Sequence, residues 1–386
     1  MAAGGTVLAM RAVVIGGGIA GVSAAHALSE VVVDGASVDV TLVEAEKALA
    51  HHTTGRSAAQ LILNYGADPV RALTRASLGF LHRPPESLVD HPLLDARDVL
   101  TVATADRNDS VERFLAEGLA TNPEIREIPI ADARELFPPL RPDWATRAIL
   151  ERDSYDIDVG GLHQAFVRGL RANGGTVRLT APVVGMERRS GRWTVTLADG
   201  EELTGDVVVN AAGAWGDVVA ALAGIAPVGL QPMRRTAFMT PSRYDDSSGW
   251  PLVADVDHNW YVKPDGSQFL CSPADEQPSE PCDARPEEID VALAIDRINT
   301  ATTLDIRHVA SSWAGLRTFT TDRSMVIGPE PAEPSFVWCV GQGGTGIQTA
   351  PAAGRLVADL VAGGEPGAMF AAIDLDLPGL LPDRFR

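Results

Sequence analysis

The sequence predicts an α/β protein in which a Rossmann-like domain is joined to a second domain with a mostly antiparallel β-sheet. Three observations support this fold class. The chain begins with a strand, glycine-rich turn, helix and second strand. It ends with another strand, glycine loop and helix, and the segment from about Gly229 to Leu316 is richer in proline and aromatic residues. A length of 386 residues suits two domains better than a single core.

The opening βαβ unit carries a nucleotide-binding pattern. A strand is expected in RAVVIGGG from Arg11, a helix in IAGVSAAHALSEVV, and a second strand in VDVTLVEAE that ends at Glu44. Gly16, Gly18 and Gly21 form G-x-G-x-x-G, which permits the tight turn, the approach of a pyrophosphate and the packing of helix on strand. The carboxylate of Glu44 can bind ribose hydroxyls. The unit predicts dinucleotide binding rather than a purely structural turn, but does not choose between FAD and NAD.

The remaining elements follow in chain order. A helix is expected in VGGLHQAFVRGLRANGG, ending at Gly174–Gly175, then a strand in TVRL, a hairpin in GRWTVTLADGEEL that turns at Asp199–Gly200, and a buried strand in GDVVVNAAGAW. Pieces such as NWYVKPDGSQFLCS indicate an antiparallel sheet, and SFVWCVGQGGTGIQTAPAAGRLVADLVAGG supplies the last strand, glycine loop and helix. Because nucleotide-type elements stand at both ends, we expect a discontinuous nucleotide-binding domain of residues 10–90, 148–228 and 318–376. Residues 91–147 and 229–317 would form the substrate-binding domain.

The composition excludes several classes of protein. Hydrophobic residues make up 45% of the chain, the mean hydropathy is +0.04, and no apolar run reaches the roughly 18–20 residues of a membrane span. A net charge of −19 would repel nucleic acid phosphates. The adjacent His51 and His52 are expected to lack nearby ligand partners, so we predict no metal site. We expect neither a nucleic acid partner nor a transmembrane segment.

The N-terminal segment and the cysteines bear on location. The stretch MAAGGTVLAMRAVVIGGG lacks a cationic leader and is interrupted by Arg11, so we expect a short tail before a strand rather than a signal peptide. The native start, at Met1 or Met10, is left open. The chain has three scattered cysteines, Cys271, Cys282 and Cys339. They favour a reducing compartment, and hence the cytoplasm, over a disulfide framework.

Arg317 needs an anion. It lies in SSWAGLRTFTTDRSMVIGPE among Trp313, Leu316 and Phe319, which are expected to be half buried. A guanidinium in such surroundings requires a negatively charged partner. The partner is either a protein acid such as Asp322 or the carboxylate of a substrate.

Three further segments suit a flavin, which is longer than a nicotinamide cofactor: HHTTGRSAAQL, VVVNAAGAWGD and GQGGTGIQTAPAAG. Together with GGGIAG, GLHQAFVRGLR, GLQPMRRTAF, YVKPD and WAGLRTF, they give the sequence an end-to-end resemblance to the FAD-dependent D-amino-acid oxidase superfamily. Within that superfamily the chain most resembles the D-arginine dehydrogenase-like enzymes. The resemblance implies a GR2-type FAD-binding domain and FAD as the cofactor. The absence of cysteine between Trp313 and Asp322, where sarcosine-oxidase-like enzymes attach the flavin, implies noncovalent binding.

The resemblance also implies cofactor-binding residues by position. The ADP half of FAD would be held by Gly16, Gly18, Ile19, Ala20, Gly21 and Glu44, and the adenine by the backbone of Val183. Thr54, Gly55, Arg56, Ser57 and Ala58 would line the phosphates and the flavin, and Ala212, Gly213 and Trp215 would lie along the cofactor. Arg317, Gly343, Gly344, Thr345, Gly346, Ile347 and Gln348 would complete the flavin site. Backbone N–H groups of this second glycine loop would stabilise the anion of reduced flavin.

The same resemblance implies a substrate site. Arg317 and Arg235 would grip the α-carboxylate, while Arg234 would point away if its strand alternates. The other implied residues are Tyr65 on a mobile lid, Tyr261 at the side-chain pocket, Gln348 and Gly344 beside the substrate, and Asp98 at its cationic end. Two departures concern the substrate: Gln60 stands where the arginine enzymes have histidine, and Asp98 is shorter than their glutamate. They leave the α-amino-acid chemistry intact but weaken the case for D-arginine.

The implied reaction is oxidation of a D-amino acid, basic or large and apolar, to an imino acid that water hydrolyses to a 2-keto acid and ammonia. Two alternatives remain open: oxidation of an N-alkyl glycine or similar secondary amine, and a flavin-binding protein without turnover. The sequence does not determine the oligomeric state or the electron acceptor, which could be oxygen, a quinone or a carrier. A substrate panel separates the first two readings.

Overall fold

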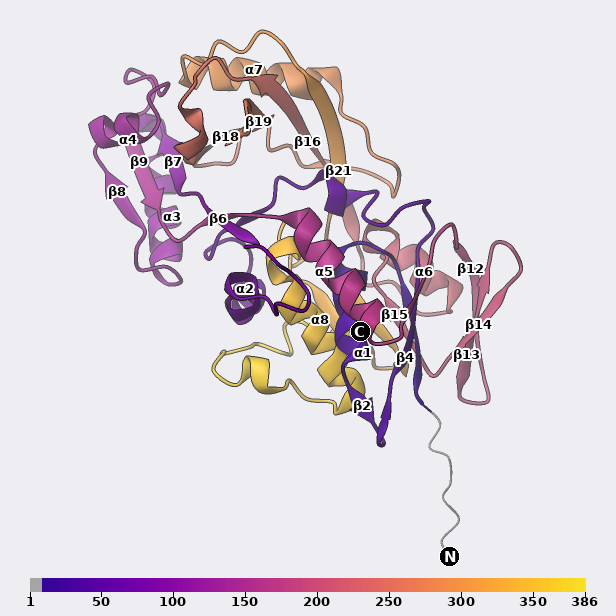
Figure 1. The fold of residues 1–386 in the computed structure, drawn as a ribbon. Helices are drawn as coiled ribbons and strands as arrows, with labels where there is room; N and C mark the ends of the chain where they lie inside the picture. The colour runs from indigo at the N-terminus through magenta and orange to yellow at the C-terminus, as the bar shows by residue number, and fades with distance from the viewer. Residues whose placement is uncertain (1–8) are drawn as a thin grey trace, which may run out of the picture.

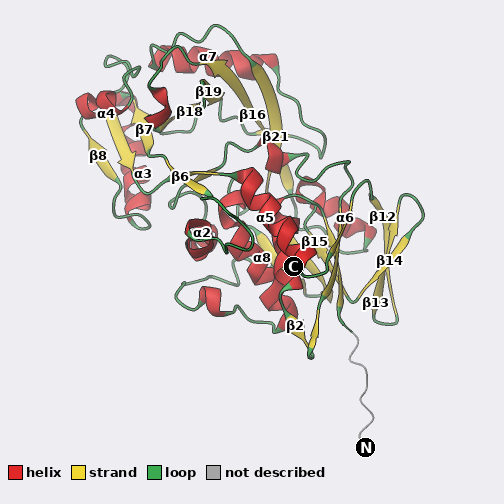
Figure 2. Ribbon diagram, viewed as in Figure 1, coloured by secondary structure: helices red, strands yellow, loops and turns green. Residues whose placement is uncertain are grey.

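The computed structural model describes residues 9–386, which form two regions stacked one above the other (Figures 1 and 2). The predicted N-terminal tail falls mainly on residues 1–8, outside the described residues. Within the described part the fold is α/β, with one largely parallel and one largely antiparallel sheet. The predicted fold class is therefore confirmed.

The parallel sheet has six strands in the order β11–β4–β1–β15–β23–β22. They are β1 (Arg11–Ile15), β4 (Asp39–Val43), β11 (Thr176–Arg178), β15 (Val207–Asn210), β22 (Val326–Glu330) and β23 (Glu333–Val340). β22 is antiparallel to β23, and the other pairs are parallel. Strands from the beginning, middle and end of the chain thus join in one sheet, as the discontinuous pattern of the sequence predicts.

The two faces of this sheet are covered differently because side chains alternate along each strand. Along β1, Ala12 and Val14 enter one core while Val13 and Ile15 enter another. The first core is closed by four helices: α1 (Ile19–Ser29), α2 (Asp68–His82), α5 (Val159–Ala172) and α8 (Gly346–Ala362). The second core is closed by α6 (Gly216–Leu222) and by the antiparallel strands β12 (Val183–Arg189), β13 (Arg192–Leu197) and β14 (Glu202–Gly205).

The second region is built on a nine-stranded sheet (Figure 1). Its strands are β7 (Val99–Ala103), β8 (Arg126–Ile128), β9 (Arg147–Glu151), β16 (Gln231–Pro241), β17 (Leu252–Asp255), β18 (Tyr261–Asp265), β19 (Gln268–Ser272), β20 (Gln277–Pro278) and β21 (Ser311–Phe319). β17 and β7 are parallel, whereas β16 pairs antiparallel with β19, β20 and β21. Helices α4 (Ile130–Leu136) and α7 (Glu288–Ala301) pack on its core, and α3 (Asn108–Leu119) lies beside β9. The proline- and aromatic-rich composition did not predict α7.

Shorter elements connect these layers. Strands β5 (Gln60–Leu61), β10 (Tyr155–Ile157) and β6 (Leu94–Ala96) form a small sheet, and β2 (Val32–Val33) pairs with β3 (Ala36–Ser37). The 3₁₀ helices are η1 (Thr53–Arg56), η2 (Ala105–Arg107), η3 (Gly213–Trp215), η4 (Ser247–Gly249), η5 (Ala368–Phe370) and η6 (Pro382–Phe385). β21 runs across residues 317 and 318, where the sequence analysis placed a domain boundary. The exact division into domains remains a prediction.

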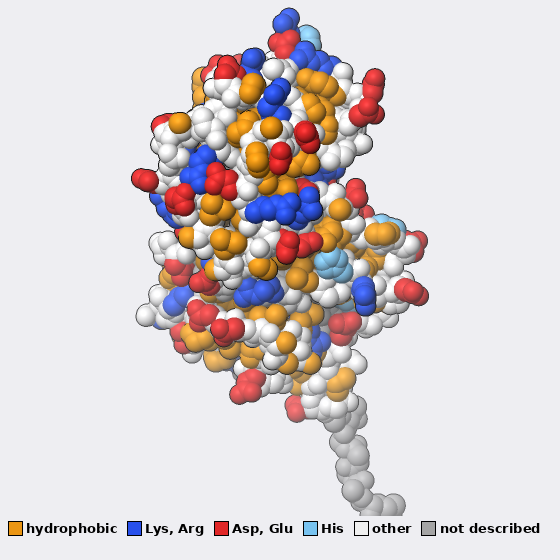
Figure 3. Space-filling view, turned by 90° about the vertical axis from the view of Figure 1, so that its left-hand side faces the viewer, with side chains coloured by type: hydrophobic (Ala, Val, Ile, Leu, Met, Phe, Trp, Pro, Cys, Tyr) orange, Lys and Arg blue, Asp and Glu red, His pale blue; other side chains and the backbone are white. Residues whose placement is uncertain are grey.

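The surface mixes charges of both signs. On the face drawn in Figure 3, acidic and basic side chains are interspersed and hydrophobic ones lie in small groups between them. Among residues 9–386, no helix combines the length and the apolar character needed to cross a membrane.

Candidate active site

A cavity of about 450 Å³ extends from the carboxyl ends of β1 and β4 to the paired strands β16 and β21. This volume lies within the usual range of small-molecule sites. The sequence-predicted residues that line it are Gly16, Gly18, Ile19, Ala20, Glu44, Thr54, Arg56, Ser57, Ala58, Val183, Ala212, Gly213, Trp215, Arg235, Tyr261, Arg317, Gly343, Gly344, Gly346 and Ile347. The structure therefore brings both glycine loops and both arginines to one cavity.

Close backbone packing explains the glycine fingerprint. Gly16 has φ +112°, and a Cβ there would lie 2.4 Å from the Ala211 carbonyl oxygen. A Cβ at Gly21 would lie 1.8 Å from the Gly16 oxygen, so Gly21 packs behind the turn rather than lining the cavity. The N-terminus of α1 then faces the cavity and offers its free N–H groups to an anion. These features fit a pyrophosphate.

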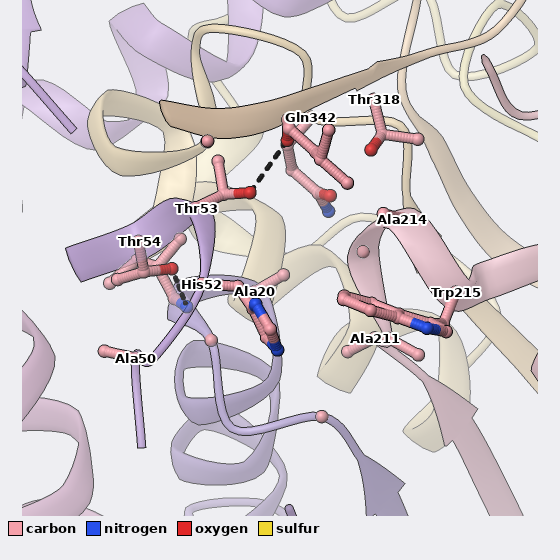
Figure 4. A pocket seen from close by; sticks show the side chains of 18 of the residues that line it. Ala20, Ala50, His52, Thr53, Thr54, Ala211, Ala214, Trp215, Thr318 and Gln342 are labelled. Atoms are coloured by element: carbon pink, nitrogen blue, oxygen red, sulfur yellow. Dashed lines mark hydrogen bonds between the residues drawn. The ribbon is translucent and has the colours of Figure 1, made fainter. Parts of the chain in front are cut away.

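Hydrogen bonds fix the residues around this turn. Glu44 accepts from the Gly17 N–H at 2.7 Å and from the Glu46 N–H at 2.9 Å, which holds its carboxylate at the end of β4. The Thr54 hydroxyl accepts from the Ile19 N–H at 3.0 Å, as Figure 4 shows. A carboxylate at this position suits ribose hydroxyls, so the first half of the cavity fits an adenine dinucleotide.

Side chains at the rim of the cavity, His52 and Arg56, make contacts with other protein groups that the sequence did not reveal. The His52 ring packs 4.7 Å from the Trp215 ring, centroid to centroid, and its Nε2 lies 3.0 Å from the Glu46 carboxylate. Ligand atoms of Glu46, His51 and His52 lie within 4.8 Å of one another, so the expectation that these histidines lack ligand partners was wrong. Arg56 donates to the Ala284 and Ala314 carbonyls at 2.9 Å each and pairs with Asp283, which ties its guanidinium to protein groups.

The two predicted carboxylate-binding arginines lie side by side on paired strands. Arg235 is opposite Gly315 in the register of β16 and β21, so Arg317, two residues along β21, is its diagonal neighbour on the same face. Arg235 donates to the Asp275 carbonyl at 2.6 Å and to the Glu276 carboxylate at 3.1 Å. Burial lowers the pKa of Arg235, and the positive charge of Arg317 lowers it further. Two cations held this close favour an added anion.

Arg317 has a neutral partner. It donates from Nη1 to the Tyr65 hydroxyl at 3.1 Å. Across residues 9–386, no salt bridge includes Arg317; Asp322, the acid considered from the sequence, binds Arg384 at 2.7 Å instead. Arg234 points to the other face, where it pairs with Glu287 and with Asp290 at 2.9 Å. The predicted alternation along this strand is therefore observed.

The second glycine loop packs directly against these groups. A Cβ on Gly344 would lie 2.9 Å from Arg317 Nη1 and 3.2 Å from the Tyr65 hydroxyl, so a side chain there would displace both. Gly343 has φ +52° and donates its N–H to the Thr318 carbonyl at 2.9 Å. The loop leads into the N-terminus of α8, which suits the flavin contact implied by the sequence.

Several predicted residues do not line the cavity. Gln348, 2% exposed, accepts from the Ile62 N–H and donates to the Ile62 carbonyl and the Thr74 hydroxyl. Gln60 donates to the Arg97 carbonyl at 3.2 Å, and the Asp98 carboxylate lies 3.9 Å from Arg152. Gly55 and Thr345 also lie outside the lining. Their assigned roles remain predictions.

Two residues near the arginines were missed by the sequence analysis. Glu276 binds both Arg235 and Arg323, the latter at 2.9 Å. The His258 ring lies 6.4 Å from the Tyr65 ring, and its pKa is lowered by burial and by the charge of Arg235. Neither residue stands in a local motif, because each reaches the site through strand pairing or a turn. No signal in the sequence identifies them.

Comparisons with known proteins establish the family and the fold of the chain. The sequence profile of the FAD dependent oxidoreductase (DAO) family matches residues 11–360. The chain is 24% identical over 429 residues to D-amino acid dehydrogenase of Xanthobacter autotrophicus, covering 92% of this chain and 96% of the relative. It is 26% identical over 399 residues to FAD-dependent oxidoreductase domain-containing protein 1 of Bos taurus, covering 90% and 80%. L-proline dehydrogenase from P. horikoshii has a similar structure, with a TM-score of 0.83, 20% identity and 98% of each chain covered.

Proposed function

Because this chain belongs to the family of FAD dependent oxidoreductases, we propose that it oxidises D-amino acids to imino acids, which water hydrolyses to 2-keto acids and ammonia. The observation that carries this proposal is the pair Arg235 and Arg317, which line the cavity beside the second glycine loop. The proposal is also supported by the similarity to a D-amino acid dehydrogenase along nearly all of both chains.

The arginine pair selects an anionic group of fixed geometry. A guanidinium presents a planar fork that matches a carboxylate, and Arg317 has no acidic partner among the described residues. A substrate α-carboxylate would supply the missing charge and fix the neighbouring carbon in the cavity. The side chain of Tyr65, which already binds Arg317, would cover that carboxylate.

The other residues of the cavity would hold the cofactor and stabilise charge on it. When bound, FAD supplies the acceptor for the hydride that leaves the substrate carbon. The residues at Gly16–Ala20 and Glu44 would hold its ADP half. The N–H groups of Gly344, Gly346 and Ile347 would stabilise negative charge on the flavin. The acids lining the cavity, Glu44 and Glu46, follow β4 at the nucleotide end. Because no acid of the described residues lines the arginine end, we propose that the substrate amine binds uncharged.

This arrangement favours large apolar side chains over basic ones. Tyr261 and Ala237 line the cavity near Arg235, whereas Asp98 faces Arg152 outside it. We therefore expect Asp98→Asn to change kcat/KM for D-arginine, D-lysine, D-methionine and D-phenylalanine alike. A selective loss with the two basic substrates would restore the proposed role of Asp98 at the substrate's cationic end.

A second candidate is oxidation of N-alkyl glycine-type amino acids. It keeps the carboxylate on the same two arginines, and it is supported by the likeness to L-proline dehydrogenase, because proline carries a secondary amine. Lack of a lining acid at the arginine end suits a secondary amine equally well.

One experiment tests both candidates. The purified flavoprotein is given D-amino acids, L-amino acids, N-methylglycine and D- and L-proline with an artificial acceptor, while oxygen uptake is followed in parallel. Oxidation of D-amino acids supports the first proposal, and oxidation restricted to secondary amines supports the second. If no compound bleaches the flavin anaerobically, the protein binds flavin without turning over amino acids.

We also propose a reducing, cytoplasmic location, since all three cysteines are free.

A further inference from the structure

The segment Ile62–Gly66, which carries Tyr65, connects the arginine pair to the second region. Gln348 holds its first residue through both the N–H and the carbonyl of Ile62. Arg71 donates to the Asn64 carbonyl at 3.3 Å, and Tyr65 accepts from Arg317. Gly66 has φ +103°, so the chain turns sharply before α2. Tyr65 therefore depends on how firmly this short segment is held.

On its other side, the segment covers a buried carboxyl group. Glu151 ends β9 and is 1% exposed, and its Oε2 has no hydrogen-bond partner among residues 9–386. Its Oε1 accepts from Asn122 Nδ2 at a long 3.4 Å. The backbone N–H of Asn64 faces the carboxyl group, and the Asn64 amide lies 3.2 Å from the Cβ position of Gly118 on α3. Asn64 thus lies against both β9 and α3, one residue before Tyr65.

We propose that Glu151 is a positioning residue for the substrate site: its neutral carboxyl group keeps the Ile62–Gly66 segment closed, with Tyr65 on Arg317, and its ionised form releases the segment. The part of this proposal that concerns substrate rests on the proposed function. The part that concerns the segment does not.

The direction follows from linkage between ionisation and opening. Burial raises the pKa of Glu151 from 4.5 to about 7, against the opposing effects of Asn122 and the Asn64 N–H. If the segment opens, water reaches the carboxyl group and its pKa returns toward 4.5. Loss of the proton therefore favours the open form. For these two pKa values, the opening equilibrium should increase about tenfold between pH 6 and pH 8.

Charged groups on the neighbouring elements do not account for this behaviour. Arg126 on β8 and Arg152 directly after β9 are both exposed. Asp98, directly before β7, lies 3.9 Å from Arg152. On α2, which follows the covering segment, Arg71 pairs with Asp68 at the surface. None of these described charges contributes to the raised pKa of Glu151, which arises from burial and is opposed by two neutral donors.

Hydrogen exchange of the Ile62–Gly66 peptide in the flavin-bound protein tests the segment directly. Exchange is measured at pH 6, 7 and 8 in wild type and in Glu151→Gln, which keeps the shape but cannot ionise. The ratio of wild-type to variant exchange rates removes the intrinsic effect of pH, and it should rise about tenfold from pH 6 to pH 8. Glu127→Gln removes a surface acid of adjacent β8 that binds Arg147, and it should follow wild type. A ratio that stays constant with pH would overturn the proposal.

Kinetics test the link to substrate. Release of Tyr65 loosens the groups around Arg317, so the KM of wild type relative to Glu151→Gln should rise with pH, while the kcat ratio should stay constant. A pH-independent KM ratio beside a changing exchange ratio would overturn the positioning role. If no amino acid is oxidised, the proposed function fails, and the exchange measurement alone decides the role of Glu151 in the segment.

Discussion

Replacing Arg317 by leucine should remove most turnover and leave a folded flavoprotein. The only described hydrogen-bond acceptor of this guanidinium is the neutral Tyr65 hydroxyl, so its full charge is available to a ligand carboxylate. A charge-assisted contact of this kind contributes roughly 1.5–3 kcal/mol. Its loss should lower kcat/KM by about 10- to 150-fold. Flavin content should hold, because the glycine fingerprint and Glu44 are untouched.

The neighbouring Arg234 should show the reverse: its replacement should lower stability and leave activity almost unchanged. Arg317→Leu removes a charge that repels Arg235, so the free energy of unfolding should change by less than about 1 kcal/mol. Arg234→Leu is the matched control, because it deprives Glu287 and Asp290 of their partner on the outer face. It should lose about 1–3 kcal/mol of stability and keep kcat/KM within about twofold.

Three measurements together decide the role of Arg317. Steady-state kinetics with the best substrate gives kcat/KM, absorbance gives flavin content, and urea unfolding gives stability. Arg317→Lys should recover only part of the activity, because an ammonium lacks the planar fork. The reasoning is refuted if Arg317→Leu sheds flavin or unfolds while the folded fraction keeps wild-type kcat/KM, because Arg317 would then serve structure.

Three further predictions concern the cofactor, the cysteines and pH. Acid or heat should release one intact FAD per chain into the supernatant, and yellow colour that stays with the precipitate would show a covalent bond. A thiol reagent should modify Cys282 at once and the other two cysteines only after unfolding. Both of these are buried, and burial raises the pKa of Cys339 to about 12. Rapid modification of all three thiols in the native protein would contradict this prediction. If the amine binds uncharged, kcat/KM should rise with pH around the amine pKa of each substrate. If the rise instead occurs at the same pH for all substrates, the ionising group belongs to the protein.

Local patterns predicted the nucleotide half of the site because backbone geometry there depends on nearby residues. Gly16 needs φ +112° and Gly21 has no room for a Cβ, so both requirements appear as glycines at fixed spacing. Alternation along β16 likewise separates Arg234 from Arg235 onto opposite faces of the strand. In each case the information lies within a few residues of sequence.

The substrate half depends on contacts between distant segments, which no local pattern encodes. Gln348 lies in the first turn of α8, directly after the second glycine loop, yet its side chain binds the backbone of Ile62, 286 residues away in sequence. Glu276 reaches Arg235 only because β20 pairs with β16. Helix α7 was missed for a related reason: its exposed face carries Ile289 and Leu293, so the polar-apolar contrast typical of a surface helix is weak.

The charges around the arginine pair connect these observations to substrate choice. Glu276 is shared between Arg235 and Arg323, so it cannot neutralise both, and Arg317 has only a hydroxyl. The site therefore keeps excess positive charge before substrate binds, and one carboxylate reduces it. An ammonium group would find no acid among the described residues that line this end, and the same arginines would repel it. If the substrate is an amino acid, as proposed, this geometry favours its anionic form. Gln60, a residue unable to act as a base, is then compatible with the proposed oxidation of an amine.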